Sequence, residues 1–253
     1  MNPNRTASIP LTFAEQLKRF FVPAKYNLER ITARELKCGE PEIHLLQVLV
    51  DRKRTAFDIG ANRGIWAHVM SRYTETVWAF EPNPVMFDWL QRGVSGKIKC
   101  LSYALSDRDG PCELLIPGKG RKFSNQGASL SETKVGDCPH LRIHAERIRL
   151  DQLDPPPVGF MKIDVEGHER EVLAGAAATI ARDRPVMIIE LEERHTGRRI
   201  EDELDHVETF GYDTFVLKDG TLHPRSAFDA DVDHRQKAGQ SGYLNNFVFR
   251  PRA

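Results

Sequence analysis

Four acidic residues stand at the ends of apolar runs, where a carboxylate could bind a ligand or accept a proton: Asp58, Glu81, Asp164 and Glu190. Apolar runs of this length, each ended by a polar residue, predict buried parallel strands. The carboxyl ends of parallel strands meet at one edge of a sheet, where α/β proteins bind their ligands. We therefore expect the four carboxylates to gather at a single site.

The segment 56–66 has the pattern of a buried strand, a glycine-bounded turn and the start of a helix. Gly60 allows a sharp turn, and Gly64 allows a ligand or the sheet to approach the backbone, because neither carries a Cβ. The spacing is Gly-x-x-x-Gly, and Asn62 replaces the middle glycine of a dinucleotide-binding turn. The turn therefore predicts a nucleotide-type cofactor, but not a pyrophosphate lying across the backbone.

Glu81 lies about twenty residues beyond this turn, where nucleotide-binding α/β folds place the acid that accepts hydrogen bonds from ribose hydroxyls. Pro82 and Pro84 end its strand. The next strand is predicted over 97–103, beside the strand of Glu81. Residues 104–107 then follow at the same edge, where they could border an adenine ring, while 107–110 also has the composition of an ordinary turn.

The chain has 253 residues with 36 basic and 36 acidic side chains, and so carries no formal net charge. A neutral chain with interspersed charges lacks the basic surface of a general nucleic-acid-binding protein. Its four cysteines lack the Cys-x-x-Cys spacing of a zinc site and indicate no disulfide framework. No apolar run reaches membrane-spanning length, and the N-terminus lacks the apolar core of a signal peptide. We expect a soluble cytoplasmic protein with no nucleic-acid partner.

Strand and helix patterns alternate along the chain, which predicts an α/β fold with a doubly wound, mostly parallel sheet. Helical spacing over 11–22 and 42–50 precedes the first strand. We therefore expect an N-terminal helical cap over residues 1–50 and a main domain over residues 51–253.

The middle of the chain departs from this alternation. An extra strand is predicted at 112–116, and an alternating apolar pattern returns over 142–150. Between them, the polar stretch 118–131 has no periodicity, and long loops of this kind are often functional, so it is a candidate substrate lid. Near the C-terminus, the acid-rich run 229–233 resembles a calcium loop but lacks its glycine and its final glutamate, so we interpret it as a solvated loop.

Five motifs occur in order at 57–64, 80–82, 104–107, 161–169 and 172–176. Together they resemble the FkbM family of S-adenosylmethionine-dependent methyltransferases, over about residues 55–249, with Lys162-Ile163-Asp164-Val165-Glu166-Gly167 as the most specific segment. The resemblance implies a class I methyltransferase fold, with a Rossmann-like sheet of seven strands. It also implies methyl transfer to oxygen, often to a hydroxyl of a sugar or of a natural product.

With S-adenosylmethionine as the implied cofactor, Asp58 and the turn 60–64 would lie under its methionine end, and Glu81 would hold the ribose. Asn83 or the turn 104–107 would border the adenine. The predicted cofactor contacts are Asp58, Gly60, Ala61, Asn62, Gly64, Glu81, Asn83, Ala104 and Leu105.

A protonated hydroxyl is a poor nucleophile, so the site needs a base or a metal that lowers the hydroxyl pKa. The candidates are Asp164, Glu166, His168 and Glu190. Asp164 and Glu190 end neighbouring strands, as in magnesium-dependent catechol-type methyltransferases, and oxygen ligands suit Mg²⁺. Alternatively, His168 accepts the proton directly, because its unperturbed pKa is near neutral. We interpret Glu169 only as an acid that suits a helix N-terminus.

Two other functions share the same fold and the same ribose-binding acid. A nicotinamide-dependent oxidoreductase would also use Glu81, although Asn62 argues against it. A nucleotide-binding protein without turnover is the other alternative, although Asp164, Glu166 and Glu190 favour an active site.

Overall fold

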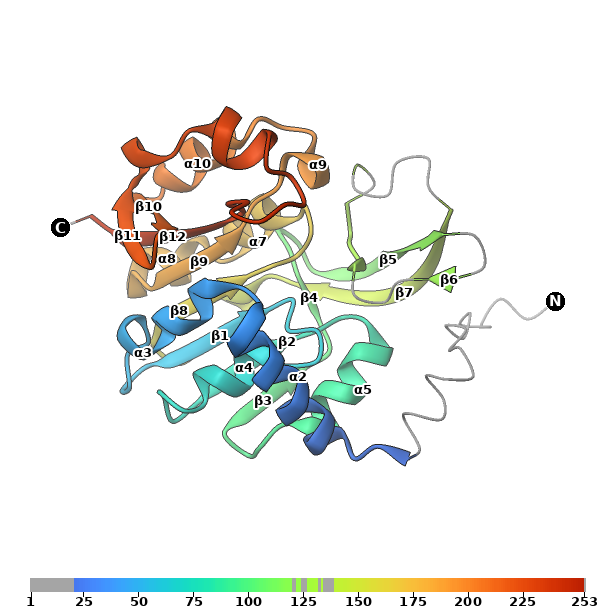
Figure 1. The fold of residues 1–253 in the computed structure, drawn as a ribbon. Coiled ribbons are helices and arrows are strands. Elements are labelled where there is room, and N and C mark those ends of the chain that lie inside the picture. The colour runs from blue at the N-terminus through green and yellow to red at the C-terminus, as the bar shows by residue number, and fades with distance from the viewer. Residues whose placement is uncertain (1–20, 120–121, 124–126, 132, 134–138, 253) are drawn as a thin grey trace.

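The computed structural model describes residues 21–252 apart from 120–121, 124–126, 132 and 134–138. Its main sheet has the strand order β11-β10-β12-β9-β8-β1-β2-β3 (Figure 1). The strands of this sheet are β1 (Thr55–Ile59), β2 (Val77–Phe80), β3 (Ile98–Leu101), β8 (Val158–Ile163), β9 (Val186–Glu190), β10 (Tyr212–Lys218), β11 (Thr221–Pro224) and β12 (Asn246–Pro251).

The strands from β3 through β1 to β9 pair in parallel, whereas β12 runs antiparallel to both β9 and β10. The doubly wound, mostly parallel sheet is therefore confirmed, with eight strands rather than seven. The eighth strand, β11, forms a hairpin with β10 through Asp219 and Gly220, which have φ values of 50° and 75°. Asp-Gly is the usual sequence for such a tight hairpin turn, so this signal was present in the sequence.

Helices cover both faces of the main sheet, and alternate residues of each strand face the two layers. Ala56 of β1 and Phe160 of β8 pack with α3 and α4, whereas Phe57 and Met161 pack with α7, α8 and α10. The helices are α2 (Ala24–Cys38), η1 (Pro41–Leu45), α3 (Leu46–Leu49), α4 (Ile65–Met70), α5 (Pro84–Gly93), α7 (Glu169–Gly175), α8 (Ala177–Asp183), α9 (Glu193–Thr196) and α10 (Ile200–Glu208), with short turns η3 (Leu150–Leu153) and η4 (Arg225–Ala227) and the π-helix η5 (Ala230–Arg235).

The N-terminal segment differs from its prediction. The helix expected over 11–22 lies almost wholly outside the described residues, and the one expected over 42–50 is divided between η1 and α3. Helix α2 was missed because its buried positions include polar Asn27 and Thr32, which weaken the apolar periodicity. It packs against α4 and α5. The domain boundary at residue 50 stays a prediction.

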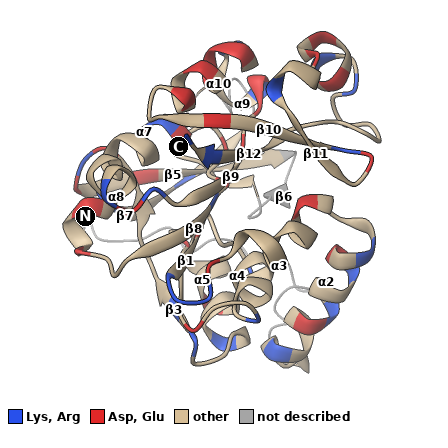
Figure 2. Ribbon diagram, turned by 90° about the vertical axis from the view of Figure 1, so that its left-hand side faces the viewer, with Lys and Arg blue, Asp and Glu red and all other residues tan. Residues whose placement is uncertain are grey.

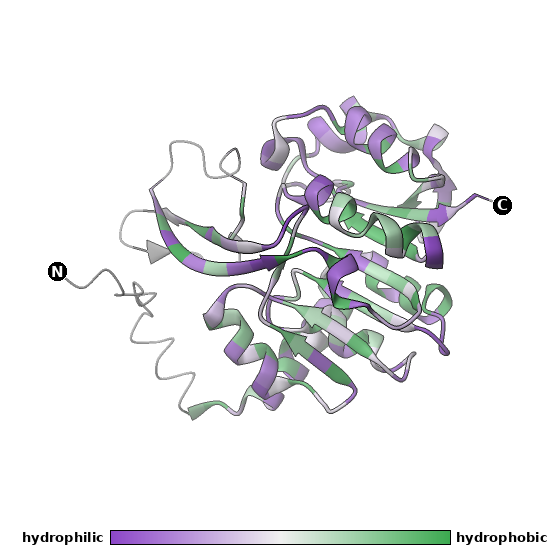
Figure 3. Cartoon of the chain, turned by 180° about the vertical axis from the view of Figure 1, so that it is seen from behind, coloured by the Kyte–Doolittle hydropathy of each residue, from purple (hydrophilic) through white to green (hydrophobic). Residues whose placement is uncertain are grey.

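A second, smaller sheet projects from the main one, with the order β4-β7-β5-β6 (Figure 1). Its strands are β4 (Ala104–Leu105), β5 (Gly110–Lys119), β6 (Lys122–Phe123) and β7 (His140–Ile148). The strands predicted at 112–116 and 142–150 correspond to the antiparallel pair β5 and β7, which we call the arm. Figure 3 shows the arm more hydrophilic than the central strands of the main sheet. Only part of the lid predicted over 118–131 lies within the described residues.

Charged residues of both signs are interspersed over the helices that cover the sheet (Figure 2). None of the helices in the described part of the chain combines the length and apolar character that a membrane crossing would need.

Candidate active site

A cleft crosses the carboxyl edge of β1 and β8, and it has two parts that share Gly60, Asn62 and Asp164. The arm-side pocket lies between the end of β2, β4 and the arm, and it encloses about 650 Å³ including the part open to solvent. The α2-side pocket extends from the same turn to helix α2. The main sheet thus carries its cleft at the edge that the sequence predicted.

Glu81 is the buried acid of the arm-side pocket, with only 6% of its surface exposed. One carboxylate oxygen accepts the backbone N–H of Asn62 and the other that of Asn83, both at 2.7 Å. Burial raises the pKa of Glu81 to about 7, although these two hydrogen bonds act in the opposite direction. Each carboxylate oxygen has a second lone pair, so both can still accept hydrogen bonds from ligand hydroxyls.

Asp58 is buried beneath the turn and accepts the backbone N–H of Ala67 at 2.7 Å, which satisfies a donor in the first turn of α4. Burial raises the pKa of Asp58 to about 7, against the lowering effects of that hydrogen bond and of Lys162. Asp58 therefore fixes the geometry of the turn 60–64. We had expected Asp58 and this turn to lie under the methionine end of the cofactor.

The two glycines of the turn have different roles. Gly60 has φ 85°, and a Cβ there would lie 1.8 Å from the backbone oxygen of Asp164, so this glycine lets the ends of β1 and β8 come together. Gly64 has φ 86°, and its Cβ would lie 2.6 Å from a methyl group of Leu90 in α5. Gly64 lines neither pocket, so the close approach that it allows here is that of helix α5.

Ala104 and Leu105 lie in the wall of the arm-side pocket, whereas Asn83 does not. The Asn83 side chain is fully buried and accepts the backbone N–H of Val85 at 3.0 Å, so it caps α5. Three residues from the described part of the predicted lid complete the wall: Ala128, Ser129 and Leu130. The apolar side of this pocket is therefore built by β4 and the loop after the arm strand β5.

Lys162 is buried among the acids of the cleft, with 1% of its side chain exposed. Its Nζ lies 3.9 Å from carboxylate oxygens of both Asp164 and Glu190, and it donates a hydrogen bond to Oδ1 of Asn246 at 2.9 Å. Burial alone would lower the pKa of Lys162, but the surrounding carboxylates outweigh burial and raise it. The lysine therefore remains a cation inside the acid cluster, which was not foreseen from the sequence.

The structure brings Asp164 and Glu190 together as predicted and adds Glu40, which precedes η1. Carboxylate oxygens of these three residues lie within 4.8 Å of one another. Mg²⁺ requires near-octahedral oxygen ligands at about 2.0–2.1 Å. The ammonium group of Lys162 already compensates two of the carboxylates and would repel a metal cation beside them. The predicted Mg²⁺ site therefore does not fit these residues.

Glu190 is largely buried, with 14% of its side chain exposed. Burial and the nearby charge of Asp164 raise its pKa well above the usual value. Its carboxylate accepts a hydrogen bond from Asn245 at 3.0 Å. Glu192 behaves differently, because Arg194 and further hydrogen bonds outweigh burial and lower its pKa to about 2.

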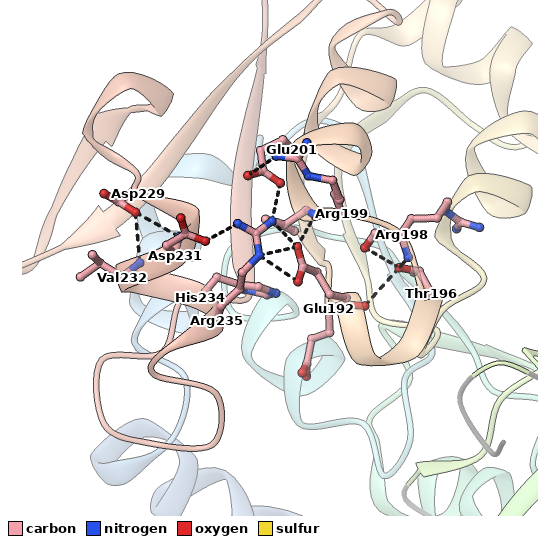
Figure 4. A network of polar contacts seen from close by, with 12 residues as sticks. Glu192, Thr196, Arg198, Arg199, Glu201, Asp229, Asp231, Val232, His234 and Arg235 are labelled. Atoms are coloured by element: carbon pink, nitrogen blue, oxygen red, sulfur yellow. Dashed lines mark hydrogen bonds and ion pairs between the residues drawn. The ribbon is translucent and has the colours of Figure 1, made fainter. Parts of the chain in front are cut away.

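The acid-rich run 229–233 is ordered rather than a solvated loop. Asp229 caps the π-helix η5, and Asp233 is buried and paired with Lys218. Arg235 joins η5 to α9 and α10 through ion pairs with Glu193 and Glu201 (Figure 4). These contacts hold the segment that leads to Asn245 and Asn246 beside the acid cluster.

His168 lies in the arm-side pocket rather than among the acids around Lys162. Its Nε2 is 3.0 Å from the hydroxyl of Ser106, and its Nδ1 is 3.5 Å from the carboxylate of Glu171. Burial lowers the pKa of His168. Through the contact between its Nε2 and Ser106, His168 joins the turn after β4 to the start of α7.

Glu166 also borders the arm-side pocket, where its carboxylate lies 3.2 Å from Nδ1 of His195. Nothing in the sequence spacing indicated this pair. Glu169 begins α7 as predicted, but it is buried and accepts the N–H of Gly167, and burial raises its pKa to about 7. The four predicted catalytic residues therefore divide into Asp164 and Glu190 beside Lys162, and Glu166 and His168 on the arm side.

A mostly parallel sheet with this strand order, a glycine turn after its first strand and an acid after its second form the class I methyltransferase fold. The family model of the methyltransferase FkbM domain matches residues 58–214, so the chain belongs to the FkbM methyltransferase family. This family match favours methyltransferase chemistry over the nicotinamide-dependent alternative.

Hexuronic acid methyltransferase AglP of Haloferax volcanii is 33% identical over 165 residues, which cover 62% of this chain and 63% of that protein. The match thus spans less than two thirds of the relative. Among solved structures, methyltransferase FkbM from Methylobacillus flagellatus superimposes with a TM-score of 0.51 at 14% identity, over 93% of this chain and 60% of that one. At this identity the likeness shows the fold alone.

Proposed function

We propose that this enzyme transfers a methyl group to a hydroxyl oxygen of a sugar that carries a carboxylate, such as a hexuronic acid. The observation that carries the proposal is the position of Asp164. Its side chain is 32% exposed and borders both pockets of the cleft, so it can meet a cofactor in one and an acceptor in the other.

We assign the adenosine part of S-adenosylmethionine to the arm-side pocket. Glu81 would accept the ribose hydroxyls, and Ala104 and Leu105 would contact the adenine through the apolar wall. The turn from Gly60 to Asn62 leads into the α2-side pocket, where it would support the methionine end. When bound, the cofactor supplies a methyl group on a cationic sulfonium, so a hydroxyl must be aligned and deprotonated as it reacts.

Asp164 is the residue that we assign as the general base. Its carboxylate faces the cleft, whereas Glu190 stands behind it and is more deeply buried. His168 is less suited, because its Nε2 contacts the hydroxyl of Ser106 and because it lies on the arm side rather than beside Lys162.

Two arginines of α2 support an acidic acceptor. Arg30 and Arg34 are one helical turn apart, and they line the α2-side pocket together with Lys162 and Asp164. Within the described part of the chain, neither guanidinium forms an ion pair. Arginine binds carboxylates through two parallel hydrogen bonds, so this pair could hold the carboxylate of a uronic acid while its ring hydroxyl faces Asp164.

The test is methyl transfer to matched glycosides of glucuronic acid and glucose, followed by mass spectrometry. We expect methylation of the uronic acid that survives mild alkali, because an ether resists conditions that hydrolyse a methyl ester. Arg30→Gln and Arg34→Gln should raise the acceptor KM at least about tenfold, in line with the loss of a charged hydrogen bond. Lys37→Gln, an exposed change at the end of the same helix, should leave it unaltered.

An alkali-labile product would mean that the carboxylate itself is methylated. If glucose glycosides react as well as uronic acids, or if both arginine variants keep the wild-type KM, the acidic-acceptor proposal is wrong.

A further inference from the structure

Lys162 belongs to the most specific segment of the sequence, yet neither the fold nor the cofactor explains why a lysine is buried there. Strand β8 places Lys162 and Asp164 on the same face, because successive side chains alternate. Asp58 of β1 is in register with Lys162, and Glu190 ends the neighbouring strand β9. The lysine side chain therefore extends beneath helices α2 and α4 toward the cleft, which it lines on the α2 side.

The hydrogen bonds of this ammonium group are incomplete. A lysine ammonium has three N–H donors. One donates to Oδ1 of Asn246 at 2.9 Å, whereas the carboxylates of Asp164 and Glu190 lie at 3.9 Å, beyond hydrogen-bonding distance. Within the described residues, two N–H groups of Lys162 therefore have no hydrogen-bond acceptor in contact.

The surroundings hold this donor in place and keep it charged. The face of the Trp66 indole lies 5.2 Å from Nζ, which is a favourable distance for a cation–π contact. The indole N–H in turn donates to Glu40 at 3.1 Å, so the N-terminal segment is tied to the cluster. A buried, fixed donor does not have to reorganise when charge develops beside it, which is the condition for strong electrostatic catalysis.

We propose that Lys162 is a catalytic residue that donates a hydrogen bond to the acceptor oxygen while Asp164 removes the proton from that oxygen. This inference rests on the proposed function, because it requires a hydroxyl acceptor in the α2-side pocket. The ammonium group takes the part that a divalent cation plays in metal-dependent methyltransferases: it stabilises the negative charge that develops on the oxygen.

The proposed step balances without any further reactant. The acceptor oxygen forms its bond to the methyl carbon as the carbon–sulfur bond breaks, and the electron pair of that bond stays on sulfur. The hydroxyl proton passes to the carboxylate of Asp164. Lys162 keeps its proton throughout, and its hydrogen bond to the oxygen strengthens as negative charge accumulates there.

The experiment compares Lys162→Met, which keeps the length of the side chain without its charge, with wild type and with Lys97→Met. Lys97 is an exposed lysine outside both pockets and serves as the control. The measurements are kcat on a uronic acid acceptor, S-adenosylmethionine affinity by calorimetry, and thermal stability. We expect Lys162→Met to lower kcat by about 10²-fold or more, as for loss of one oxyanion donor, with cofactor affinity within about threefold of wild type.

Chemical rescue separates hydrogen-bond donation from charge compensation. In Lys162→Ala, ethylammonium should restore kcat in a saturable manner, whereas tetramethylammonium should not, because it has a positive charge but no N–H donor. Treatment with a chelator should leave wild-type activity unchanged. Equal rescue by the two ions, or a requirement for added Mg²⁺ in the wild type, would overturn the inference.

If the Met and Ala variants do not fold, wild-type protein labelled with ¹⁵N-lysine provides the second measurement. The Nζ resonance of Lys162 should shift when the acceptor binds, but not with an analogue that lacks the reacting hydroxyl. An unchanged resonance, or a folded Lys162→Met with wild-type kcat, refutes the role of Lys162 while leaving the proposed function standing. If the wild type methylates no sugar, the proposed function fails and this inference fails with it.

Discussion

Glu81 gives the sharpest test of the cofactor assignment, because its titration should be visible in binding. Burial raises its pKa to about 7, so the carboxylate is ionised in roughly one molecule in eleven at pH 6 and in about ten of eleven at pH 8. Ribose hydroxyls donate hydrogen bonds, which an ionised carboxylate accepts more strongly than a neutral carboxyl. We therefore expect affinity for the product cofactor, S-adenosylhomocysteine, to rise about tenfold between pH 6 and pH 8.

The assay is isothermal titration calorimetry at half-unit pH intervals on wild type, Glu81→Gln and Glu42→Gln. Glu81→Gln removes the titration and should remove this pH dependence, with a loss of about 1.5–3 kcal/mol in binding at pH 8 for a charged hydrogen bond. Glu42 is the matched control: it is a buried acid whose pKa burial also raises to about 7, but it lies outside both pockets. Its variant should keep the wild-type pH dependence.

The same titration has the opposite effect on the stability of the cofactor-free protein. The folded state raises the pKa of Glu81 above its ordinary value of 4.5, so it binds the proton more tightly than the unfolded chain. The stability that Glu81 contributes is complete below about pH 4.5 and is lost as the pH rises through about 7.

If Glu81→Gln keeps the pH dependence of cofactor binding, the Glu81 carboxylate does not contact the ribose and the cofactor assignment is wrong.

Three further predictions concern the turn, the base and the segment after β11. Gly60→Ala should destabilise the fold by more than about 3 kcal/mol in urea unfolding, because its Cβ would meet the backbone of Asp164 at 1.8 Å. Gly64→Ala should lower the free energy of unfolding by less, because its Cβ would meet the movable side chain of Leu90. Asp164→Asn should lower kcat by about 10²–10⁴-fold with unchanged cofactor affinity, and retained kcat would exclude Asp164 as the base. Arg235→Ala should lower stability by about 1–2 kcal/mol, since it removes several partly exposed ion pairs, and an unchanged melting temperature would contradict their importance.

Seven of the eight strands of the main sheet were readable from the sequence because each carries its own local signal. The run Thr55–Ile59 is buried at every position, as an apolar strand between two helical layers must be. The acids at 58, 81, 164 and 190 follow or end such runs, and parallel pairing alone brings them to one edge. Local pattern and topology together therefore predicted the fold class and the position of the cleft.

What each residue does at that edge was decided by contacts between segments that are distant in the sequence. Nothing near Gly60 shows that the backbone of Asp164 lies against it, and nothing near Asn83 shows that its side chain is consumed in capping α5. Glu40 joins the acid cluster only because the chain from α2 to η1 folds back over β8.

Lys162 shows most clearly the difference between what local sequence predicts and what contacts between distant segments decide. The spacing of a lysine two residues before Asp164 on a buried strand is enough to put both side chains on one face. The packing of β9 and β12 against β8 brings Glu190 and Asn246 to the ammonium group, so a cation remains among the acids where Mg²⁺ had been expected. Charge compensation and hydrogen bonding depend on distances of a few ångströms between strands, and no single stretch of sequence contains those distances.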